Sequence, residues 1–364
     1  MKIFKNKTVL VTGHTGFKGS WLSIWLNSLG AKVVGLSIDI PTEPSIFSSS
    51  LLGGMIEDHR HDIRDIIGIK KLVNQVKPDF VFHLAAQALV RKSYEDPLET
   101  MSINALGSVT ILEAIRQLDK KVIAIMITSD KAYDNVEWMW GYRETDRLGG
   151  KDPYSASKGM AELAIRSFVE SFFNTPESNI RVGVTRAGNV IGGGDWAKDR
   201  IVVDAVLAWS KNEPVKVRNP QATRPWQHVL EPLSGYLNLG KELFNNKKLN
   251  GEGFNFGPSS EQNRTVKELL SDLSKYWDLD INEKIFIVKD PISFHEAKLL
   301  KLNCEKSLAL LNWRSVLDYK DTIRFTSEWY KNYYTEPDSV QIKTINQIIE
   351  YEDFAKNKKL VWTE

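Results

Sequence analysis

The sequence predicts an α/β fold, a doubly wound parallel sheet of Rossmann type with a smaller mixed C-terminal lobe that binds substrate. Glycines recur as Gly-x-x-Gly-x-x-Gly within residues 13–19, directly after a short apolar run. Strand-like apolar runs then alternate with helical patterns up to about residue 188, and the alternation breaks up beyond it. Alternating strands and helices imply right-handed crossovers and a parallel sheet covered on both faces.

Apolar periodicity and helix start and stop signals place the individual elements. The predicted strands are residues 8–11, 32–37, 80–84, 122–128 and 181–186, and the predicted helices are residues 16–29, 66–76, 98–118, 154–173 and 319–334. In the helix over 98–118, the expected inward positions are Leu98, Met101, Ala105, Leu112 and Ile115.

The chain divides into parts without a low-complexity linker. Residues 1–188, together with segments that return later, are expected to form the dinucleotide-binding domain. Residues 189–345 mainly form the substrate lobe, and residues 346–364 form a polar tail whose order stays open.

Composition narrows the class of protein. The net charge of +2 over 364 residues leaves no electrostatic footprint for nucleic acid or an acidic membrane. A single cysteine, Cys304, excludes an internal disulfide, and no Cys/His cluster has zinc spacing, so no metal site is expected. No apolar run has the length of a membrane span, and the basic first residues lead straight into a strand. We therefore expect a cytoplasmic protein.

The glycine turn is typical of a pyrophosphate site. It follows a strand and precedes a helix, so backbone N–H groups and the positive helix end can face a ligand without side-chain obstruction. The alternative is a turn that merely packs a helix on a sheet.

Tyr154 and Lys158 lie four residues apart in a predicted helix and so share one face. Asp152 and Pro153 precede them as an N-cap and a first helical residue. A nearby ammonium favours the phenolate of tyrosine, which could take a proton from a sugar hydroxyl as hydride leaves. The alternative is an ordinary pair on a helix surface.

A polar loop, Thr128-Ser129-Asp130-Lys131, follows the strand over residues 122–128. It falls at the carboxyl edge of the sheet, where open α/β sheets bind ligands. A hydroxyl, a carboxylate and an amine in a row are also common in any polar loop.

Taken together, these motifs resemble the extended short-chain dehydrogenase/reductase superfamily and, within it, the CDP-glucose 4,6-dehydratases. The resemblance covers nearly the whole chain. The blocks that carry it are residues 12–21, 62–65, 84–87, 104–108, 128–131, 140–144, 152–155, 185–196 and 224–229.

The resemblance implies a lyase that converts CDP-D-glucose to CDP-4-dehydro-6-deoxy-D-glucose and water, with NAD recycled in each turnover. Tyr154 would remove the O4 proton, Lys158 would hold the ribose, and Thr128 would hydrogen-bond the O4 region. Asp130 would protonate the departing O6. Lys131 would be either the C5 base or an electrostatic stabiliser of the enolate, and these two roles stay open.

The resemblance also implies which residues contact NAD. They are Gly13, His14, Thr15, Gly16, Phe17, Lys18, Gly19, Ser37, Asp39, Asp62, Ile63, Leu84, Ala85, Ala86, Thr128, Tyr154 and Lys158. His14 replaces a small residue and is expected to crowd the pyrophosphate. Ser37 stands where relatives often have a ribose-binding aspartate, and no arginine ends the second strand, which favours NAD over NADP.

For the nucleotide sugar, the residues implied are Gln87, Ser129, Asn189, Arg200, Arg224 and His228. Arg224 would offer a cationic fork to the diphosphate, the alternative for Arg224 and His228 being a surface loop. Trp138, Trp140 and Trp196 are interpreted as packing residues rather than base-stacking ones.

Two further expectations follow from the resemblance. A homodimer, or a higher homo-oligomer, would pair helices 98–118 and 154–173 in a four-helix bundle. The product would be used to make a deoxysugar of a surface polysaccharide.

Two alternatives to a CDP-glucose dehydratase stay open. One is a dehydratase or epimerase of another nucleotide sugar, such as GDP-mannose or a UDP- or dTDP-sugar, and the other is a non-catalytic dinucleotide sensor.

Overall fold

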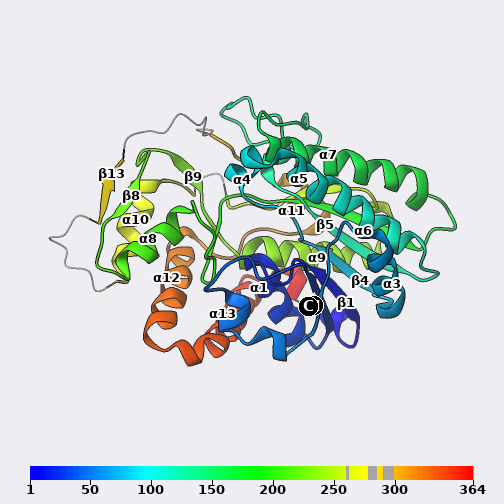
Figure 1. Ribbon diagram of the computed structural model, residues 1–364, viewed down its shortest axis with the longest axis horizontal. Helices are drawn as coiled ribbons and strands as arrows, with labels where there is room; N and C mark the ends of the chain where they lie inside the picture. Colours follow the sequence, from blue (N-terminus) through cyan, green and yellow to red (C-terminus); the bar gives the residue numbers. More distant parts are fainter. Residues whose placement is uncertain (260–261, 278–284, 290–298, 364) are drawn as a thin grey trace.

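The structure is a computed structural model that describes residues 1–364 except 260–261, 278–284, 290–298 and 364 (Figure 1). Its centre is a seven-stranded sheet in the order β11-β6-β5-β4-β1-β2-β3, in which every neighbouring pair is parallel. The strands are β1 Thr8–Thr12, β2 Lys32–Ser37, β3 Glu57–Arg60, β4 Phe80–His83, β5 Val122–Ile127, β6 Ile180–Arg186 and β11 Gly253–Asn255. This confirms the predicted doubly wound fold.

The chain winds outward from β1 in both directions, so the switch point lies between β1 and β4, where open sheets bind ligands. Alternate residues of the central strands enter two separate cores. Val9 and Val11 face one core and Leu10 faces the other. Both faces are covered, which explains the continuous apolar runs that predicted these strands.

Helices pack on both faces of the sheet (Figure 1). One face carries α1 Phe17–Ser28, α9 Leu230–Asn245 and α13 Val340–Asn357, and the other carries α3 Ile66–Val76, α6 Gly107–Arg116 and α7 Pro153–Phe168. The shorter elements here are α2 Ile46–Ser49, α4 Val90–Glu95, α5 Pro97–Met101, η1 Lys2–Phe4, η2 Leu52–Gly54, η4 Asp130–Ala132 and η6 Lys247–Leu249.

The single helix predicted over residues 98–118 is interrupted. A π-helical turn, η3 Ser102–Leu106, separates α5 from α6, and a second, η5 Val169–Phe173, continues α7. A π turn holds more residues than an α turn, so it rotates the preceding positions around the helix axis. Ala105, Leu112 and Ile115 are buried as expected, but Leu98 is 79% exposed, so its inward assignment was wrong.

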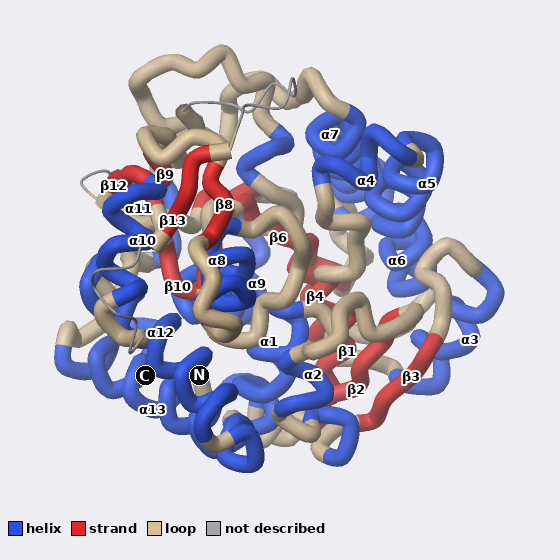
Figure 2. Tube along the Cα trace, turned by 60° about the vertical axis from the view of Figure 1, so that its left-hand side comes forward, coloured by secondary structure: helices blue, strands red, loops and turns tan. Residues whose placement is uncertain are grey.

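The lobe that was expected to bind substrate combines three small strand pairs with helices. β7 Val190–Ile191 pairs with β10 Gln227–His228, β8 Val215–Val217 with β13 Phe286–Val288, and β9 Thr223–Pro225 with β12 Asn263–Thr265. The helices of this part are α8 Ile201–Trp209, α10 Val266–Ser274 and α12 Tyr319–Thr335. In Figure 2 this lobe stands beside the sheet, with β8, β9 and β13 together.

Several later segments return to the sheet. Within residues 189–345, α9 packs on β5 and β6, β11 extends the sheet, and α11 Glu305–Leu311 packs on β11. The tail is helical, with η7 Pro337–Ser339 and η8 Val361–Thr363 flanking α13. The amino group of Met1 donates to the carbonyl of Trp362 at 3.4 Å, so the two ends lie together (Figures 1 and 2).

Candidate active site

The candidate site forms at the carboxyl edge of the sheet, where the loops after β1, β4 and β5 meet the start of α7. Gly13 adopts a φ of +75°, and a Cβ there would lie 2.7 Å from the Ala85 nitrogen. A Cβ on Gly19 would lie 2.0 Å from the Gly13 carbonyl oxygen. The turn therefore needs glycine at both positions and brings the segment 84–86 against residues 13–19.

The amino end of α1 suits a phosphate group. Gly16 is its N-cap and offers no side-chain capping bond. A helix end left in this way directs backbone N–H groups and the positive end of the helix dipole outward. The residues present thus fit the pyrophosphate of a dinucleotide.

His14 turns away from this edge, which corrects the expectation that it crowds the pyrophosphate. Its imidazole is completely buried, with Nε2 2.9 Å from the Asp58 carboxylate and Nδ1 3.0 Å from the Ser37 hydroxyl. A Cβ on Gly35 would lie 2.4 Å from the ring, so glycine in β2 makes room for it. Burial lowers the pKa of His14, which keeps the ring neutral.

The end of β2 is tied to the glycine turn. The Ser37 hydroxyl accepts the Thr15 N–H at 3.3 Å, and the Thr15 hydroxyl donates to the Asp39 carbonyl at 2.6 Å. Arg60, from the neighbouring strand β3, donates to the same carbonyl at 3.1 Å. The sequence-based expectation considered an arginine only at the end of β2, and Arg60 reaches this point from β3.

The segment after β3 holds two residues predicted to contact NAD, Ile63 and Asp62, and their side chains have different surroundings. Ile63 is buried, and its Cδ1 would meet a Cβ on Gly107 at 2.5 Å, so it anchors α6. The Asp62 carboxylate accepts the Arg64 guanidinium at 2.6 Å, and this hydrogen bond lowers its pKa.

Tyr154 and Lys158 stand on α7, as predicted. Asp152 caps the helix by accepting the Ser155 N–H at 2.9 Å, and Pro153 occupies its first turn. Burial raises the pKa of Tyr154 to about 12, so the phenol holds its proton at neutral pH in this structure. Burial lowers the pKa of Lys158 to about 8, opposed by the charge of Glu162.

The loop after β5 is folded into the short helix η4. The Ser129 hydroxyl caps it by accepting the Lys131 N–H at 3.2 Å and donates to the Asp130 carboxylate at 2.9 Å. Asp130 is buried against the Gly188 backbone, where a Cβ would lie 1.8 Å from its Oδ2. Lys131 is half-buried beside it.

Hydrogen bonds that sequence reasoning missed fix α7 in place. The Asn104 amide donates to the Ser157 hydroxyl at 2.8 Å, and that hydroxyl donates to the Tyr154 carbonyl at 2.7 Å. The Ser93 hydroxyl accepts the Tyr154 N–H at 3.1 Å. In the sequence, the position of Asn104 within the block over residues 104–108 is the single hint of this role.

Two predicted substrate residues are structural, which corrects those assignments. The Gln87 side chain is buried, and its amide donates to the Leu89 carbonyl and the Thr100 hydroxyl, both at 3.0 Å. His228 is completely buried, with its ring 5.9 Å from that of Trp21 and 5.4 Å from that of Phe325. Neither side chain is therefore free to meet a sugar.

The other substrate residues stay at the interface of sheet and lobe. Asn189 takes a φ of +54° between β6 and β7, and Arg224 lies in β9 opposite Arg264 of β12. Arg200 donates to the Asp195 carboxylate at 2.5 Å, and its charge lowers the pKa of Tyr154 against the rise from burial.

Lys18 interacts electrostatically with the same groups. Burial, followed by the positive charge of Arg200, lowers the pKa of Lys18 to about 8, and the charges of Asp130 and Lys158 also act on it. These residues come from four different parts of the chain, so the fold concentrates charge at this edge.

The three tryptophans interpreted as packing residues differ in their burial. Trp196 is buried and packs edge-on against Tyr330, as expected for a packing residue. Trp138 packs on Tyr142, with ring centroids 5.3 Å apart, and contacts Trp140 edge-on. The two tryptophans are 38% and 66% exposed, so their packing is less complete than that of Trp196.

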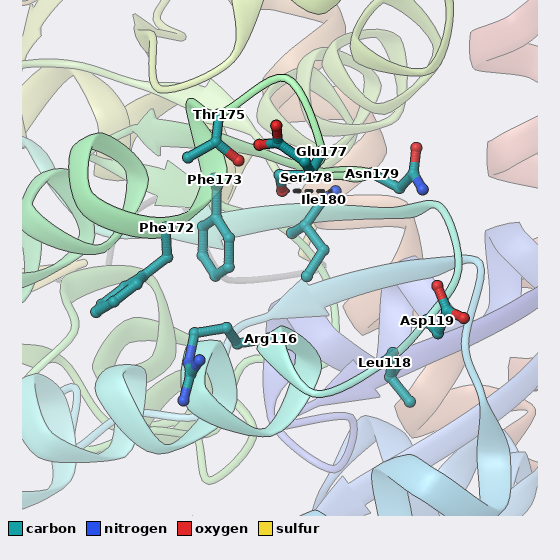
Figure 3. A pocket seen from close by; sticks show the side chains of 10 residues that line it. All are labelled: Arg116, Leu118, Asp119, Phe172, Phe173, Thr175, Glu177, Ser178, Asn179 and Ile180. Carbon is teal, nitrogen blue, oxygen red and sulfur yellow. Dashed lines mark hydrogen bonds between the residues drawn. The ribbon is translucent and has the colours of Figure 1, made fainter.

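A hollow of about 260 Å³ lies at the opposite end of β5 and β6 (Figure 3). It is lined by Arg116, Leu118, Asp119, Phe172, Phe173, Thr175, Glu177, Ser178, Asn179 and Ile180. None of these is a predicted site residue. Across the described residues, no cluster of His, Cys, Asp and Glu could hold a metal ion, and no helix is long and apolar enough to cross a membrane.

Fold and site together define a short-chain dehydrogenase/reductase of the extended type. A profile described as GDP-mannose 4,6-dehydratase matches residues 10–326. The chain belongs to this family of nucleotide-sugar dehydratases.

One curated relative agrees with this placement, and two solved structures share the fold. The chain is 45% identical to a CDP-glucose 4,6-dehydratase of Salmonella typhimurium over 90% of this chain and 91% of that protein. Its fold resembles that of a UDP-glucose 4-epimerase of Thermotoga maritima with UDP-glucose, with a TM-score of 0.76 and 22% identity over 90% and 99% of the two chains. It also resembles a UDP-glucose 4-epimerase of Thermus thermophilus in complex with NAD, with a TM-score of 0.73 and 24% identity over 89% and 99%.

Proposed function

We propose that this chain is an NAD-dependent hydro-lyase that converts CDP-D-glucose to CDP-4-dehydro-6-deoxy-D-glucose and water. The observation that carries the proposal is the 45% identity to a CDP-glucose 4,6-dehydratase across nine-tenths of the chain. Thr128, Asp130, Lys131, Tyr154 and Lys158 stand at one edge of the sheet and supply the groups that the reaction needs.

NAD, when bound, supplies the acceptor for the C4 hydride and then the donor of hydride to C6. The glycine turn and the bare end of α1 hold its pyrophosphate. Tyr154, as phenolate, takes the O4 proton, and the Lys158 ammonium and Arg200 favour that phenolate. Thr128 contacts the O4 region of the sugar.

Elimination follows once C4 is a ketone, because a carbonyl acidifies the neighbouring C5–H. Lys131 either takes that proton on its amine and returns it to C5 when hydride reaches C6, or stabilises the enolate by its charge while a water molecule takes and returns the proton. Asp130 gives a proton to the departing O6, which leaves as water. Ser129 donates to Asp130 and thereby holds its carboxyl group in place. Arg224 and Asn189 contact the diphosphate.

The test is turnover of a panel of nucleotide sugars, with and without added NAD. We expect water loss from CDP-glucose to yield the 4-keto-6-deoxy product, and the absorbance of that product measures the turnover. Turnover of GDP-mannose, UDP-glucose or dTDP-glucose with none of CDP-glucose would overturn the substrate assignment. C4 inversion without water loss would favour the epimerase alternative.

We also propose a cytoplasmic homodimer. Leu98 of α5 and Leu163 of α7, 79% and 59% exposed, lie on the helices expected to form a four-helix bundle with a second copy. Light scattering of the purified protein measures its mass directly, and a monomer of 41.4 kDa would contradict the dimer.

A further inference from the structure

The hydroxyl of Thr128 is already committed within the protein. Its oxygen lies 2.6 Å from Glu162 Oε1 and 3.0 Å from the Thr185 carbonyl oxygen. Both partners are acceptors, and a hydroxyl has one proton. That proton therefore points into the protein, so Thr128 offers only lone pairs to a ligand.

Glu162 is held by a buried guanidinium. Arg186 Nε lies 2.7 and 3.0 Å from the two carboxylate oxygens, and Nη2 donates to Oε2 as well. The side chains of Glu162 and Arg186 are 4% and 5% exposed. Arg186 also donates to the Tyr133 hydroxyl at 2.6 Å, and Tyr133 donates to Asn255 at 2.8 Å.

This network joins the site to its supports. Thr128 follows β5, Glu162 lies on α7, Arg186 ends β6, Tyr133 follows η4 and Asn255 ends β11. Glu162 also follows Lys158 by four residues, so the two share one face of α7. A buried ion pair is weak evidence for stability, because desolvation offsets its attraction. A role in the site explains the pair better than stability does.

We propose that Glu162, oriented by Arg186, is a positioning residue that fixes Thr128 as a hydrogen-bond acceptor and balances the buried ammonium of Lys158. The proposal rests on the proposed function for its kinetic consequences. As an acceptor, Thr128 receives a hydrogen bond from a sugar hydroxyl beside O4 and so aligns the sugar, while the O4 proton stays directed at Tyr154. The carboxylate lowers the cost of keeping a cation at Lys158 away from water.

Other titratable groups near Lys158 also bear on the pH at which its ammonium loses a proton. Lys18 of α1 and His83 of β4 interact with it electrostatically, and Tyr154 shares its helix. Asp130 acts on both Lys18 and Tyr154. Glu162 is the acidic group that acts directly on the Lys158 charge. Its removal should lower the pKa of that ammonium.

The experiment compares wild type with the neutral double variant Glu162→Gln/Arg186→Gln. The matched control is Glu113→Gln/Arg116→Gln, a Glu–Arg pair joined at 2.7 Å on α6 whose side chains are 23% and 39% exposed. We expect the double variant to lose at least tenfold in kcat with little change in KM for CDP-glucose. The alkaline limb of its pH profile should move to lower pH, while the control keeps the wild-type profile.

A purely structural role would change thermal stability without moving that limb. A folded double variant with wild-type kcat and an unmoved limb would overturn the proposal. If the double variant does not fold, Glu162→Asp replaces it. That variant keeps the charge but shortens the reach to Thr128, so we expect a lower kcat with an unmoved limb, and an unchanged kcat would count against the proposal.

A second readout needs no turnover. The reactivity of Lys158 toward acetic anhydride, measured by peptide mass spectrometry against pH, gives the midpoint of its titration. We expect a lower midpoint in the double variant than in wild type. An equal midpoint refutes the charge-balancing role, even if CDP-glucose proves not to be the substrate.

Discussion

Gly19 makes the closest backbone approach in the glycine turn. A methyl group there would lie 2.0 Å from the Gly13 carbonyl oxygen, so Gly19→Ala must displace the turn. We expect the variant to lose roughly 1–3 kcal/mol of unfolding free energy, as overpacked sites do, and to bind NAD more weakly. Thermal unfolding and NAD titration measure the two effects.

Gly54→Ala is the control for this variant. Nothing lies within 4 Å of the Cβ it would add, so we expect its stability and NAD affinity to match wild type. Equal NAD affinity in Gly19→Ala and Gly54→Ala would mean that the turn does not hold the cofactor.

Lys131 decides between two chemical roles. Lys131→Ala should lower kcat by roughly 10²–10⁴-fold, the range of a lost general base, while CDP-glucose still binds. Lys131→Arg separates the roles, because arginine keeps the charge but does not deprotonate in proteins. Activity kept in Lys131→Arg supports a stabiliser of the enolate, and loss equal to that of alanine supports a base. Wild-type elimination in Lys131→Ala would exclude both roles.

Sequence reasoning found the residues of the site whose pattern is local. Tyr154 and Lys158 are linked by helical spacing, and Asp152 by its place before a proline. It could not find Glu162 and Arg186, because the partners lie 24 residues apart and the chain holds 46 acidic residues. It also misjudged His14, since only the fold places Gly35 beneath the ring and Asp58 beside it.

At the scale of elements, Glu231 links α9 to the segment before α12 and to α13. Its carboxylate accepts the N–H groups of Val316 and Leu317, the shortest at 2.6 Å, and the Tyr351 hydroxyl at 3.0 Å. Glu231→Gln puts an NH₂ group among these donors. We expect a loss of about 1–3 kcal/mol, the cost of a buried group left unpaired.

Urea unfolding measures that loss, and limited proteolysis tests whether α13 opens first. Glu242→Gln, on the same helix at a half-buried position, is the control and should match wild type. An equally stable Glu231→Gln with a protected α13 would show that the carboxylate is not the link.

Periodicity predicted the long elements and failed at short or polar ones. The bounds of β2 and α3 agree with the sequence to the residue. The edge strand β3 reads Glu-Asp-His-Arg and β11 has three residues, so neither carries an apolar pattern to detect. The π turn η3 is likewise invisible to a 3.6-residue period, which explains the misplaced Leu98.

At the scale of the whole molecule, the C-terminal tail packs against α1. Tyr351 and Trp362 are buried, and their rings stack 5.9 Å apart beside Trp25 of α1. The polar composition of residues 335–364 hid this, because the apolar residues of α13 are divided between buried positions, such as Ile348, and exposed ones, such as Ile342 and Ile349. Parts of the chain that are far apart in sequence thus stabilise the sheet that bears the site.

The stability of the whole chain should depend on pH through groups that the fold buries. Burial lowers the pKa of His83 and of His228 to about 3, from 6.5 in the unfolded chain. Between these values the unfolded state binds the proton and the folded state does not, so stability falls as pH falls, by about 2 kcal/mol per histidine between pH 7 and 5. Burial raises the pKa of Glu231 to about 7, from 4.5. Here the folded state binds the proton more tightly than the unfolded chain does. The stabilisation that this proton gives is therefore fully present below pH 4.5 and is lost as pH rises through 7.

These opposite tendencies can be separated by substitution. His228→Phe removes one histidine and leaves an aromatic ring between Trp21 and Phe325. We expect its unfolding free energy to fall about 2 kcal/mol less than that of wild type between pH 7 and 5. Glu231→Gln should fall about 2 kcal/mol more over the same interval, because the opposing contribution is gone. Urea unfolding at both pH values measures the differences, and since each variant is compared with itself, a constant packing cost cancels. A wild-type slope in His228→Phe would mean that the buried imidazole titrates alike in the folded and unfolded chains.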